Sequence, residues 1–329
     1  MTAKRVLILH PDIAADAPPE DLDTLVQVEA IEAALKSRRQ VVTKAAFTRE
    51  PEALAAIIRS HSADVVFNLV ESVDGSGRES AIVPAMLDAL GVKYTGAGGI
   101  VLAATCDKPL TKRMLRDAGL PTPDWAEPPD WEGLNDARRY IVKSALEDAS
   151  VGLDDDSVVM GAAKIRARAA ACEKQFGGRW FAEAYVHGRE FNVAVLQSSQ
   201  GPRILPLAEM TFQEWQPGRV KIVGYRAKWD DDSFESTRTV RAFGLEHSEP
   251  GLAAELRALA RQTWNLLGIN GYARIDFRVD EKGRPTILEV NPNPCLSPDA
   301  GFAAAAARAG LNYELLMAHI VETALNEPR

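Results

Sequence analysis

Two segments near the end of the chain carry polar residues at a spacing that could build a metal site. In the run YARIDFRV, polar and apolar residues alternate, so that Arg274 and Asp276 project from the same face of a strand. The run PTILEVN is arranged in the same way and places Glu289 and Asn291 on one face. Carboxylate and amide oxygens are ligands of Mg²⁺, with waters and nucleotide phosphates completing its coordination. The spacing therefore predicts a site for phosphate chemistry.

The residues between these two runs predict that the strands pair. Residues 280–284 (DEKGR) have the composition of a hairpin turn. Two antiparallel strands joined in this way would bring three oxygen donors and one guanidinium to a single site. The alternative is a surface hairpin with solvated charges, in which Arg274 forms a salt bridge with Asp276 or Glu289.

Length and charge restrict what kind of protein this is. The chain has 329 residues, which is enough for two or three domains and a substantial core. Its net charge of −8 argues against a nucleic-acid surface. Three cysteines without paired spacing favour a reducing compartment, and no apolar run approaches the roughly 18 residues of a membrane span. We expect a soluble, cytoplasmic protein that binds neither nucleic acid nor membrane.

The first third of the chain alternates strand-like and helical segments. This alternation predicts a parallel sheet covered by helices on both faces. Ligands of such sheets bind beyond the carboxyl ends of the strands, so His10, Asn68 and Glu71 would face a crevice. The expected strands are 6–9, 40–47, 64–69 and 92–94, and the expected helices are 25–35, 51–60 and 79–90.

Beyond this unit the chain mixes strands, helices and long loops. Residues 95–99 are expected to form a flexible connection. Their glycines do not have the spacing of a dinucleotide-binding fingerprint. Residues 145–156 are expected to form a mobile polar loop. The other expected elements are a helix that carries Lys108 and Lys112, strands 140–143, 180–186 and 190–196, a helix at 250–267, and one or two helices within 303–325.

A series of short motifs runs in one order along the chain. They are GVKYTG (91–96), DK (107–108), GLPTP (119–123), IVK (141–143), EAYVHGREF (183–191), YRAKW (225–229), ARIDF (273–277) and LEVN (288–291). Each is weak alone, but in this order they resemble the D-alanine–D-alanine ligase family of ATP-grasp carboxylate–amine ligases. The resemblance runs from about Asn68 to the C-terminus and is weaker over the N-terminal sheet.

The resemblance implies a fold and a division into domains. The expected class is α/β and α+β, with an ATP-grasp fold that follows an N-terminal parallel-sheet (pre-ATP-grasp, Rossmann-like) domain. Residues 1–104 would form the N-terminal α/β substrate-binding domain, and residues 105–182 the central ATP-grasp lobe. Residues 183–329 would form the C-terminal ATP-grasp lobe, which holds the metal and catalytic residues. The family also implies a homodimer.

The resemblance further implies a two-stage reaction. ATP phosphorylates a substrate carboxylate, giving an acyl phosphate and ADP, and an amine then attacks so that phosphate leaves and an amide forms. The implied cofactors are ATP and two Mg²⁺ ions, with Mn²⁺ as a possible substitute, and the implied partners are a small-molecule carboxylate and an amine. The metal ligands would be Asp276, Glu289 and Asn291, with Glu289 bridging both ions.

The motifs also assign roles to other residues. Arg274, Lys228 and Ser150 are the candidate catalytic residues, and Lys228 would contact the γ-phosphate from a mobile loop that closes over ATP. Taken alone, the lysines would be solvated surface residues, and Glu183 and Glu190 would be strand-edge charges. The candidate ATP-binding residues are Lys108, Lys143, Glu183, Tyr185, Val186, Glu190, Phe212, Lys228 and Leu288.

The chain departs from the family pattern in segments that bind substrate. Asp148 and Ala149 stand where the family has a glycine and a serine in its phosphate loop, and Trp229 stands where its mobile loop has a tyrosine. The N-terminal Gly-rich segment of the family is replaced by His10-Pro11-Asp12 and the acidic stretch 20–23. Cys295 and Ala300 stand where the family has a glycine and a serine. These changes spare the ATP and metal motifs, which predicts a ligase of this family with different substrates.

The candidate substrate-binding residues follow from these positions. Asp299 could receive a cationic amine or guanidinium or could cap a helix, and Cys295 could be a nucleophile, although packing is the simpler interpretation. The identity and chirality of the substrates, and which substrate is phosphorylated, are left open. The candidates are His10, Glu79, Trp229, Cys295, Asp299 and Gly301.

Three alternative functions remain open at this stage. The first is a genuine D-alanine–D-alanine ligase of cell-wall synthesis. The second is a non-catalytic ATP-binding regulatory protein, although Arg274 would be unnecessary for binding alone. The third is phosphorylation of a small molecule without ligation.

Overall fold

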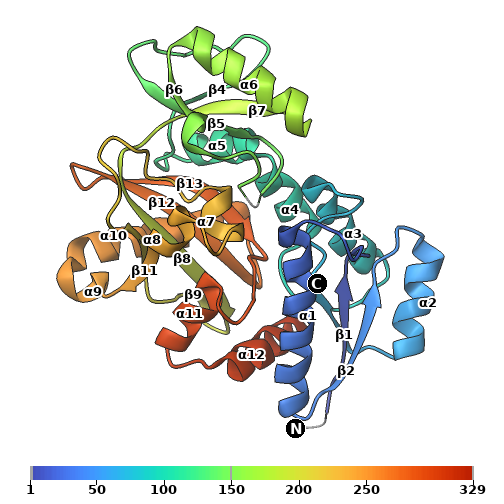
Figure 1. Cartoon of the computed structure of the whole chain (residues 1–329). Coiled ribbons are helices and arrows are strands. Elements are labelled where there is room, and N and C mark those ends of the chain that lie inside the picture. The colour runs from blue at the N-terminus through green and yellow to red at the C-terminus, as the bar shows by residue number, and fades with distance from the viewer. Residues whose placement is uncertain (1–2, 149, 328–329) are drawn as a thin grey trace.

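The computed structural model describes residues 3–148 and 150–327. Ala149, one of the departures noted above, lies outside the described residues. Three sheets follow one another along the described chain, one in each of the three predicted domains (Figure 1). The mixed α/β and α+β class is confirmed, and the boundaries after residues 104 and 182 remain a proposal.

The first sheet is parallel, as the alternating pattern predicts. Its strand order is β2-β1-β3, formed by β2 (Val41–Ala46), β1 (Arg5–His10) and β3 (Val65–Asn68). Figure 1 shows α1 (Pro19–Ser37) and α2 (Pro51–His61) on opposite sides of β1 and β2. Because both faces are covered, residues 6–9 of the central strand are all apolar and fully buried.

Three local predictions in this region were incomplete. Residues 92–94 form only a single bridge from Tyr94 to Val66 instead of a strand. The expected helix at 79–90 is a 3₁₀-helix (Gly77–Ala81) followed by α3 (Ile82–Ala89). Helix α1 begins at Pro19, so the acidic stretch lies in its first turns, where the helix dipole favours negative charge.

The glycine-rich connection after this sheet is packed, contrary to the prediction that it is flexible. Thr95 is fully buried, and the backbone N–H of Ala97 donates a hydrogen bond to Asn293 Oδ1 at 2.8 Å. A Cβ on Gly96 would clash with the same Asn293 side chain, and Gly96 has a φ of +87°. The connection leads into α4 (Gly99–Cys106), a helix that the sequence pattern did not predict, and then α5 (Lys108–Asp117).

The second sheet is antiparallel and forms the middle of the chain. Its order is β4-β7-β5-β6, and α6 (Ala162–Phe176) packs against it through Ile165, Ala169 and Cys172. The strands are β4 (Trp125–Ala126), β7 (Trp180–Ala184), β5 (Arg139–Ser144) and β6 (Val158–Met160).

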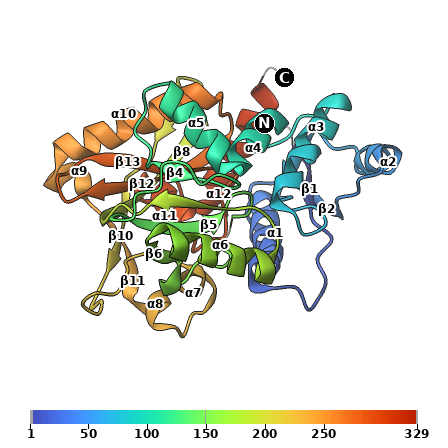
Figure 2. The ribbon, with the colours of Figure 1, turned by 90° about the horizontal axis from the view of Figure 1, so that it is seen from above.

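The third sheet carries the hairpin predicted from the sequence. Its order is β11-β10-β8-β12-β13, with β9 paired to β8, and α10 (Pro250–Leu267) runs along one side of it (Figure 2). The short helices α7 (Tyr225–Trp229), α8 (Phe234–Arg238) and α9 (Leu245–Ser248) lie between its strands in sequence. The strands are β8 (Gly188–Ser198), β9 (Gly201–Ile204), β10 (Ala208–Phe212), β11 (Thr239–Phe243), β12 (Tyr272–Asp280) and β13 (Pro285–Pro292).

The C-terminal helices join the first and third sheets through one hydrophobic core. Helices α11 (Gly301–Arg308) and α12 (Tyr313–Asn326) contribute Phe302, Leu316 and Met317 to a cluster that includes Ile31 and Leu35 of α1. The first and third sheets are therefore held together by one continuous hydrophobic core. Among the described helices, none combines the length and apolar character needed to cross a bilayer.

Candidate active site

The hairpin of β12 and β13 brings its four polar residues together, as predicted. Asp276 lies directly opposite Glu289, and Arg274 lies opposite Asn291. On the other side of β12, strand β8 places Asn192 opposite Asp276. The polar face of the third sheet thus concentrates carboxylate, amide and guanidinium groups in one small area.

A β-bulge in β13 alters the simple alternation assumed from the sequence. Phe277 pairs with Ile287 and Asp276 with Glu289, so Leu288 is an extra residue without a partner in the ladder. Leu288 and Glu289 consequently both line the cleft, although they are adjacent in sequence. The bulge explains how an apolar residue and a candidate metal ligand reach the same cavity.

The carboxylate of Asp276 is held by three side chains. Arg274 donates to both of its oxygens, from Nε to Oδ1 at 2.8 Å and from a terminal nitrogen to Oδ2 at 2.9 Å. Asn192 donates to Oδ1 at 2.8 Å and Asn291 to Oδ2 at 3.0 Å. Burial would lower the pKa of Arg274, but the Asp276 and Glu289 carboxylates outweigh burial and raise it. The salt bridge anticipated as an alternative for Arg274 is therefore present.

Glu289 interacts with three lysines, Lys108, Lys143 and Lys228. Lys108 approaches Glu289 Oε1 at 3.1 Å and also donates to Asp148 Oδ1 at 2.8 Å. Burial would raise the pKa of Glu289, but Lys108, Lys143 and Lys228 lower it overall. Glu289 is therefore ionised at neutral pH and able to act as a hard oxygen ligand.

A buried triad of one carboxylate and two lysines lies next to Glu289. Glu183 forms ion pairs with Lys112 and, at 3.0 Å, with Lys143. Lys112 also donates to the backbone oxygen of Leu288 at 3.2 Å, which ties α5 to the bulge. Burial lowers the pKa of Lys112 to about 8, with Glu183 acting in the opposite direction. Both oxygens of Glu183 already face lysines, so its predicted contact with adenine remains a prediction.

Glu190 is also engaged by a buried cation. Arg278 forms an ion pair with Glu190 Oε2 at 2.8 Å and donates to the backbone oxygen of Gly188 at 3.1 Å. Burial raises the pKa of Glu190, while Arg278 counteracts this increase. Glu190 lines the same cavity as Glu183, Tyr185 and Val186, which places the four candidates for nucleotide contact on one wall.

The segment predicted as a mobile loop covers the cleft as helix α7. Tyr225 donates from its hydroxyl to Glu20 Oε2 in α1 at 2.7 Å, and its backbone N–H donates to Leu153 O at 3.1 Å. Ser150 donates to the backbone oxygen of Val223 at 3.1 Å. Gly224 is required there because a Cβ would lie 2.8 Å from Leu153 O. The covering segment thus contacts both the phosphate-loop segment and the N-terminal domain.

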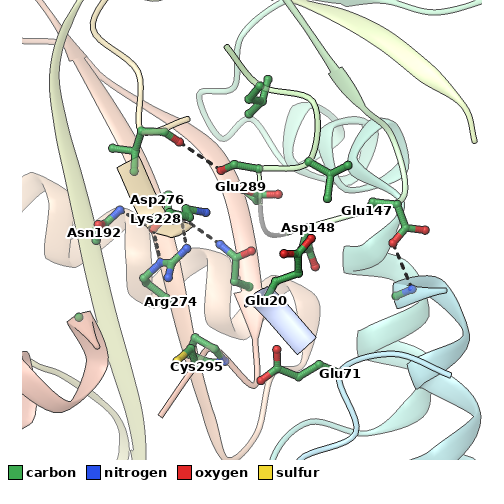
Figure 3. A pocket seen from close by; sticks show the side chains of 18 of the residues that line it. Glu20, Glu71, Glu147, Asp148, Asn192, Lys228, Arg274, Asp276, Glu289 and Cys295 are labelled. Carbon is green, nitrogen blue, oxygen red and sulfur yellow. Dashed lines mark hydrogen bonds and ion pairs between the residues drawn. The ribbon is translucent and has the colours of Figure 1, made fainter. Parts of the chain in front are cut away.

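Lys228 of this covering helix faces the cavity (Figure 3). Its pKa is lowered, first by burial in the cleft and then by Arg274, while Glu289 and Asp276 act in the opposite direction. A lysine in this position is able to interact with an anion that binds between α7 and the hairpin.

The other end of the cavity is built from α1, the segment after β3 and the segment before α11. Gln27 donates from Nε2 to both Asp23 Oδ2 and Glu71 Oε1, each at 3.1 Å. Asp23 also accepts from Ser297 Oγ at 2.8 Å and from Cys295 Sγ at 3.1 Å. Desolvation by the surrounding protein raises the pKa of Glu71 to about 7, and Asp23 adds to the effect while Gln27 opposes it.

One cavity of about 920 Å³ connects these groups, and most of the predicted site residues line it. Three do not. His10 hydrogen-bonds the oxygen of Pro11 at 2.7 Å, Glu79 pairs with Arg49, and Phe212 packs on Trp215 with ring centroids 4.9 Å apart. Met210, two residues before Phe212, lines the cavity in its place. The structure therefore does not bring these three residues into the cavity, because each side chain contacts a neighbour outside it.

The candidate substrate residues Trp229, Cys295, Asp299 and Gly301 all line the cavity. Asp299 does not cap α11, because Ala300 occupies the N-cap position without a side-chain hydrogen bond. Burial, together with Glu71 and Asp23, raises the pKa of the Cys295 thiol. The thiol is therefore protonated and donates a hydrogen bond, which argues against a nucleophile.

Many residues that line the cavity were not among the predicted site residues, and three of them carry amide or guanidinium groups: Asn192, Arg278 and Arg241. Asn192 follows Glu190 by two positions, and Arg278 follows Asp276 by two, so the alternation of their strands could have identified both. Arg241 of β11 also lines the cavity, and no signal in the sequence indicates it.

Comparisons with known proteins agree on one family. The profile of the D-ala D-ala ligase C-terminus family matches residues 134–322. An uncharacterized protein of Sinorhizobium fredii, y4sG, is 31% identical over 267 residues, which cover 80% of this chain and 76% of that protein. The D-alanine–D-alanine ligase of Methylococcus capsulatus is 31% identical over 265 residues, which cover 79% of this chain and 78% of that protein.

Solved structures agree at the level of the fold. The D-alanine–D-alanine ligase of Bacillus anthracis complexed with ATP superposes with a TM-score of 0.74 at 20% identity, and 98% of each chain is covered. The D-alanine–D-alanine ligase of Coxiella burnetii has a TM-score of 0.72 at 18% identity, covering 99% of this chain and 95% of that one.

Proposed function

This chain belongs to the D-alanine–D-alanine ligase family of ATP-grasp ligases, and we propose that it joins a small carboxylate to an amine, with amino-acid or small-amine substrates that differ from a pair of D-alanines. The reaction consumes ATP and forms a carbon–nitrogen bond through an acyl phosphate. The proposal includes the division into three domains given above. A homodimer and a cytoplasmic location stay predictions.

One observation carries the proposal. The hairpin and its neighbours assemble Arg274, Asp276, Glu289 and Asn291 in one cavity with Lys108. Hard oxygen donors beside several cations suit a triphosphate that carries divalent metal ions, because the cations and the metal together neutralise phosphate charge.

The donor set fits Mg²⁺ in particular. Among the described residues, no group of three or more His, Cys, Asp and Glu is arranged to hold a metal by itself. Two carboxylates and an amide fit an ion that is bound by few protein ligands and completed by phosphates and water. Asn291 donates its Nδ2 to Asp276, which leaves its Oδ1 available for a cation. The metal would increase the electrophilicity of the γ-phosphate.

The remaining residues position and neutralise charge. Lys108 and Lys143 would bind phosphate oxygens, and Lys228 would contact the γ-phosphate from α7. Arg274 would stabilise the oxyanion that develops when the amine attacks. The hydrogen bond from Tyr225 to Glu20 holds α7 over the cleft, which would exclude water from a hydrolysable acyl phosphate.

The residues that line the far end of the cavity support the proposal that the substrates differ from a pair of D-alanines. Glu71, Asp23 and Cys295 form a hydrogen-bonded cluster with Gln27 there. Such a cluster favours a ligand with its own polar groups over a methyl side chain. A genuine D-alanine–D-alanine ligase is the second candidate, because relatives about 31% identical bear that name.

The test is a screen of D- and L-amino acids and amines, alone and in pairs. ADP release and the mass of the product are measured together. We expect an amide with a pair other than D-alanine with itself. Efficient turnover of D-alanine alone would favour the dipeptide ligase, and ADP release with a phosphorylated product but no amide would contradict ligation.

A further inference from the structure

The carboxylates that line the cavity fall into two groups. Those at the nucleotide end each have a lysine or arginine within 4.0 Å: Asp148, Glu183, Glu190, Asp276 and Glu289. Another group has no such partner among the described residues, and most of its members lie toward the opposite end: Glu20, Asp21, Asp23, Glu71, Glu147 and Asp299. Beyond this distance Arg241 still interacts with Asp299 and Lys108 with Glu147. The remaining members of the group, Glu71 among them, therefore carry negative charge that no described lysine or arginine nearby balances.

Glu71 is the carboxylate that is best placed to meet a ligand. Its Oε1 accepts a hydrogen bond from Gln27, and no donor to its Oε2 is found within the described residues. Gln27 is itself fixed, because its Oε1 accepts from the backbone N–H of Leu296 at 2.9 Å. Figure 3 shows Glu71 next to Cys295, at a distance from the group around Glu289. The carboxylate is thus held in place by neutral groups alone.

The neutral network around Glu71 brings a second negative charge close to it. Gln27 Nε2 is shared between Glu71 and Asp23, at 3.1 Å from each carboxylate. The other donors to Asp23 are a hydroxyl and a thiol, from Ser297 and Cys295. Two carboxylates that share one amide donor repel each other, and a cation bound beside them would relieve this repulsion.

An independent observation also indicates a ligand at this end. Asn68 lines the cavity and is 2% exposed, yet its Nδ2 has no hydrogen-bond partner in residues 3–148 and 150–327. Its orientation is set, because its Oδ1 accepts from the backbone N–H of Val70 at 3.2 Å. A buried donor without a partner is unfavourable, so an acceptor on a bound molecule would supply the missing hydrogen bond to Asn68 Nδ2. A ligand near Asn68 and Glu71 thus needs both an acceptor and a cation.

We propose that one of the two substrates is an amino acid with a cationic side chain, an amine or guanidinium, and that Glu71 selects it. This inference rests on the proposed ligase function. A single α-ammonium would balance only one of the carboxylates at the substrate end, whereas a basic amino acid carries two cationic groups. Its carboxylate or carbonyl oxygen would supply the acceptor for Asn68.

The test compares pairs of amino acids that match in shape and differ in charge. Arginine is compared with citrulline, and ornithine with norleucine, in both chiral forms and with the co-substrates of the screen. Amide formation gives kcat/KM for each. We expect the charged member of at least one pair to be preferred tenfold or more, with the difference mainly in KM. Equal or reversed preference in every pair would overturn the inference.

Two variants identify the residue responsible. Glu71→Gln keeps an oxygen for the hydrogen bond from Gln27 but removes the charge, so we expect the preference to fall at least fivefold because kcat/KM falls more for the charged member than for the neutral one. Glu71→Asp keeps the charge and should retain part of the preference. An unchanged preference in Glu71→Gln would exclude Glu71 as the selecting residue.

The same data separate this inference from the ligase function. Amide formation with neutral amino acids at equal efficiency would reject the charge assignment and leave the ligase function intact. Absence of any amide product, in these pairs and in the wider screen, would reject the ligase function and this inference with it.

Discussion

At the scale of single residues, the cleft is organised by how each charge is neutralised. Arg274 binds Asp276 through two hydrogen bonds, and Lys108 lies between Glu289 and Asp148. At the nucleotide end, then, most charges have an opposite partner. A ligand with phosphates and a metal would replace the ion pairs among these side chains with ion pairs to itself. The desolvation free energy of binding is then smaller than for unpaired charges.

Arg274 provides the first prediction. In Arg274→Ala, Asp276 keeps its hydrogen bonds from Asn192 and Asn291, so the nucleotide site should remain formed. We expect kcat to fall by about 10²–10³-fold, as for the loss of one oxyanion donor. ATP affinity, measured by equilibrium binding, should change little. Unchanged turnover would contradict the role of Arg274 in catalysis.

Glu71 provides a prediction about stability. Its side chain is exposed within the cavity, yet desolvation by the surrounding protein raises its pKa to about 7 from a usual value of 4.5. Between these two values the folded state holds a proton that the unfolded state has lost, so stability falls as pH rises through this range. Glu71→Gln should therefore be more stable than the wild type at pH 8, by about 1 kcal/mol because the side chain keeps contact with solvent in the cavity.

Urea denaturation at pH 4.5 and pH 8 measures this effect. The difference between Glu71→Gln and the wild type should be small at pH 4.5 and should appear at pH 8. A difference of the same size at both pH values would show that desolvation of the Glu71 charge is not its cause.

Most of the site could be predicted from residue types and their spacing, for a clear physical reason. Arg274, Asp276, Glu289 and Asn291 lie on two strands of one hairpin, so their geometry follows from local alternation. His10 was misplaced because a position after a strand does not determine where the side chain turns. The hydrogen bonds of Gln27 to Glu71 and Leu296 could not be foreseen, since they join distant segments.

At the scale of elements, two local features shape the cleft. The bulge at Leu288 rotates part of β13 so that adjacent residues share the cavity. Helix α7 crosses the opening and is tied to α1 by Tyr225 and Glu20. The alternation predicted the strands but not the bulge, because an inserted residue changes only the register. The resemblance indicated the covering segment but not its anchor.

The hydrogen bond that joins α7 to α1 gives a prediction about the coupling of ATP consumption to amide formation. Tyr225→Phe removes the hydrogen bond to Glu20, which contributes about 1 kcal/mol to the closed state. With the cleft open more often, water should reach the acyl phosphate, and ADP released should exceed amide formed. The ratio of the two products is the measurement.

Tyr140→Phe is the matched control. It also loses a hydroxyl hydrogen bond, to Gly133 O at 3.3 Å, but Tyr140 is buried in the middle sheet away from the cavity lining. This control should keep a ratio of ADP to amide close to that of the wild type. Equal ratios in the two variants would contradict a role for Tyr225 in holding α7 closed.

At the scale of the whole molecule, the first and third sheets share a core. Leu316 and Met317 of α12 are fully buried in a cluster with α1 and with Tyr272 of β12. The sequence of the Ala-rich C-terminal region predicts one or two helices within 303–325. Which elements those helices join depends on the tertiary fold, and the sequence pattern does not contain that information.

This shared core predicts how the molecule unfolds. Leu316→Ala should lower the free energy of unfolding by about 2–5 kcal/mol, because it leaves a cavity in the core. The neighbouring Leu315 is 38% exposed, so Leu315→Ala should have an effect within about 0.5 kcal/mol. Calorimetry of both variants measures the difference, and similar losses would contradict the assigned packing of α12.

The most direct test of the account follows an oxygen atom. The amino acid that the screen selects as carboxylate substrate is labelled with ¹⁸O in both carboxyl oxygens and incubated with ATP, Mg²⁺ and the amine. Transfer of the γ-phosphoryl group to this carboxylate, followed by attack of the amine, leaves one ¹⁸O in each phosphate released. We predict phosphate with one ¹⁸O, in step with ADP and amide. Unlabelled phosphate released with ADP would contradict an acyl phosphate and the proposed ligase mechanism.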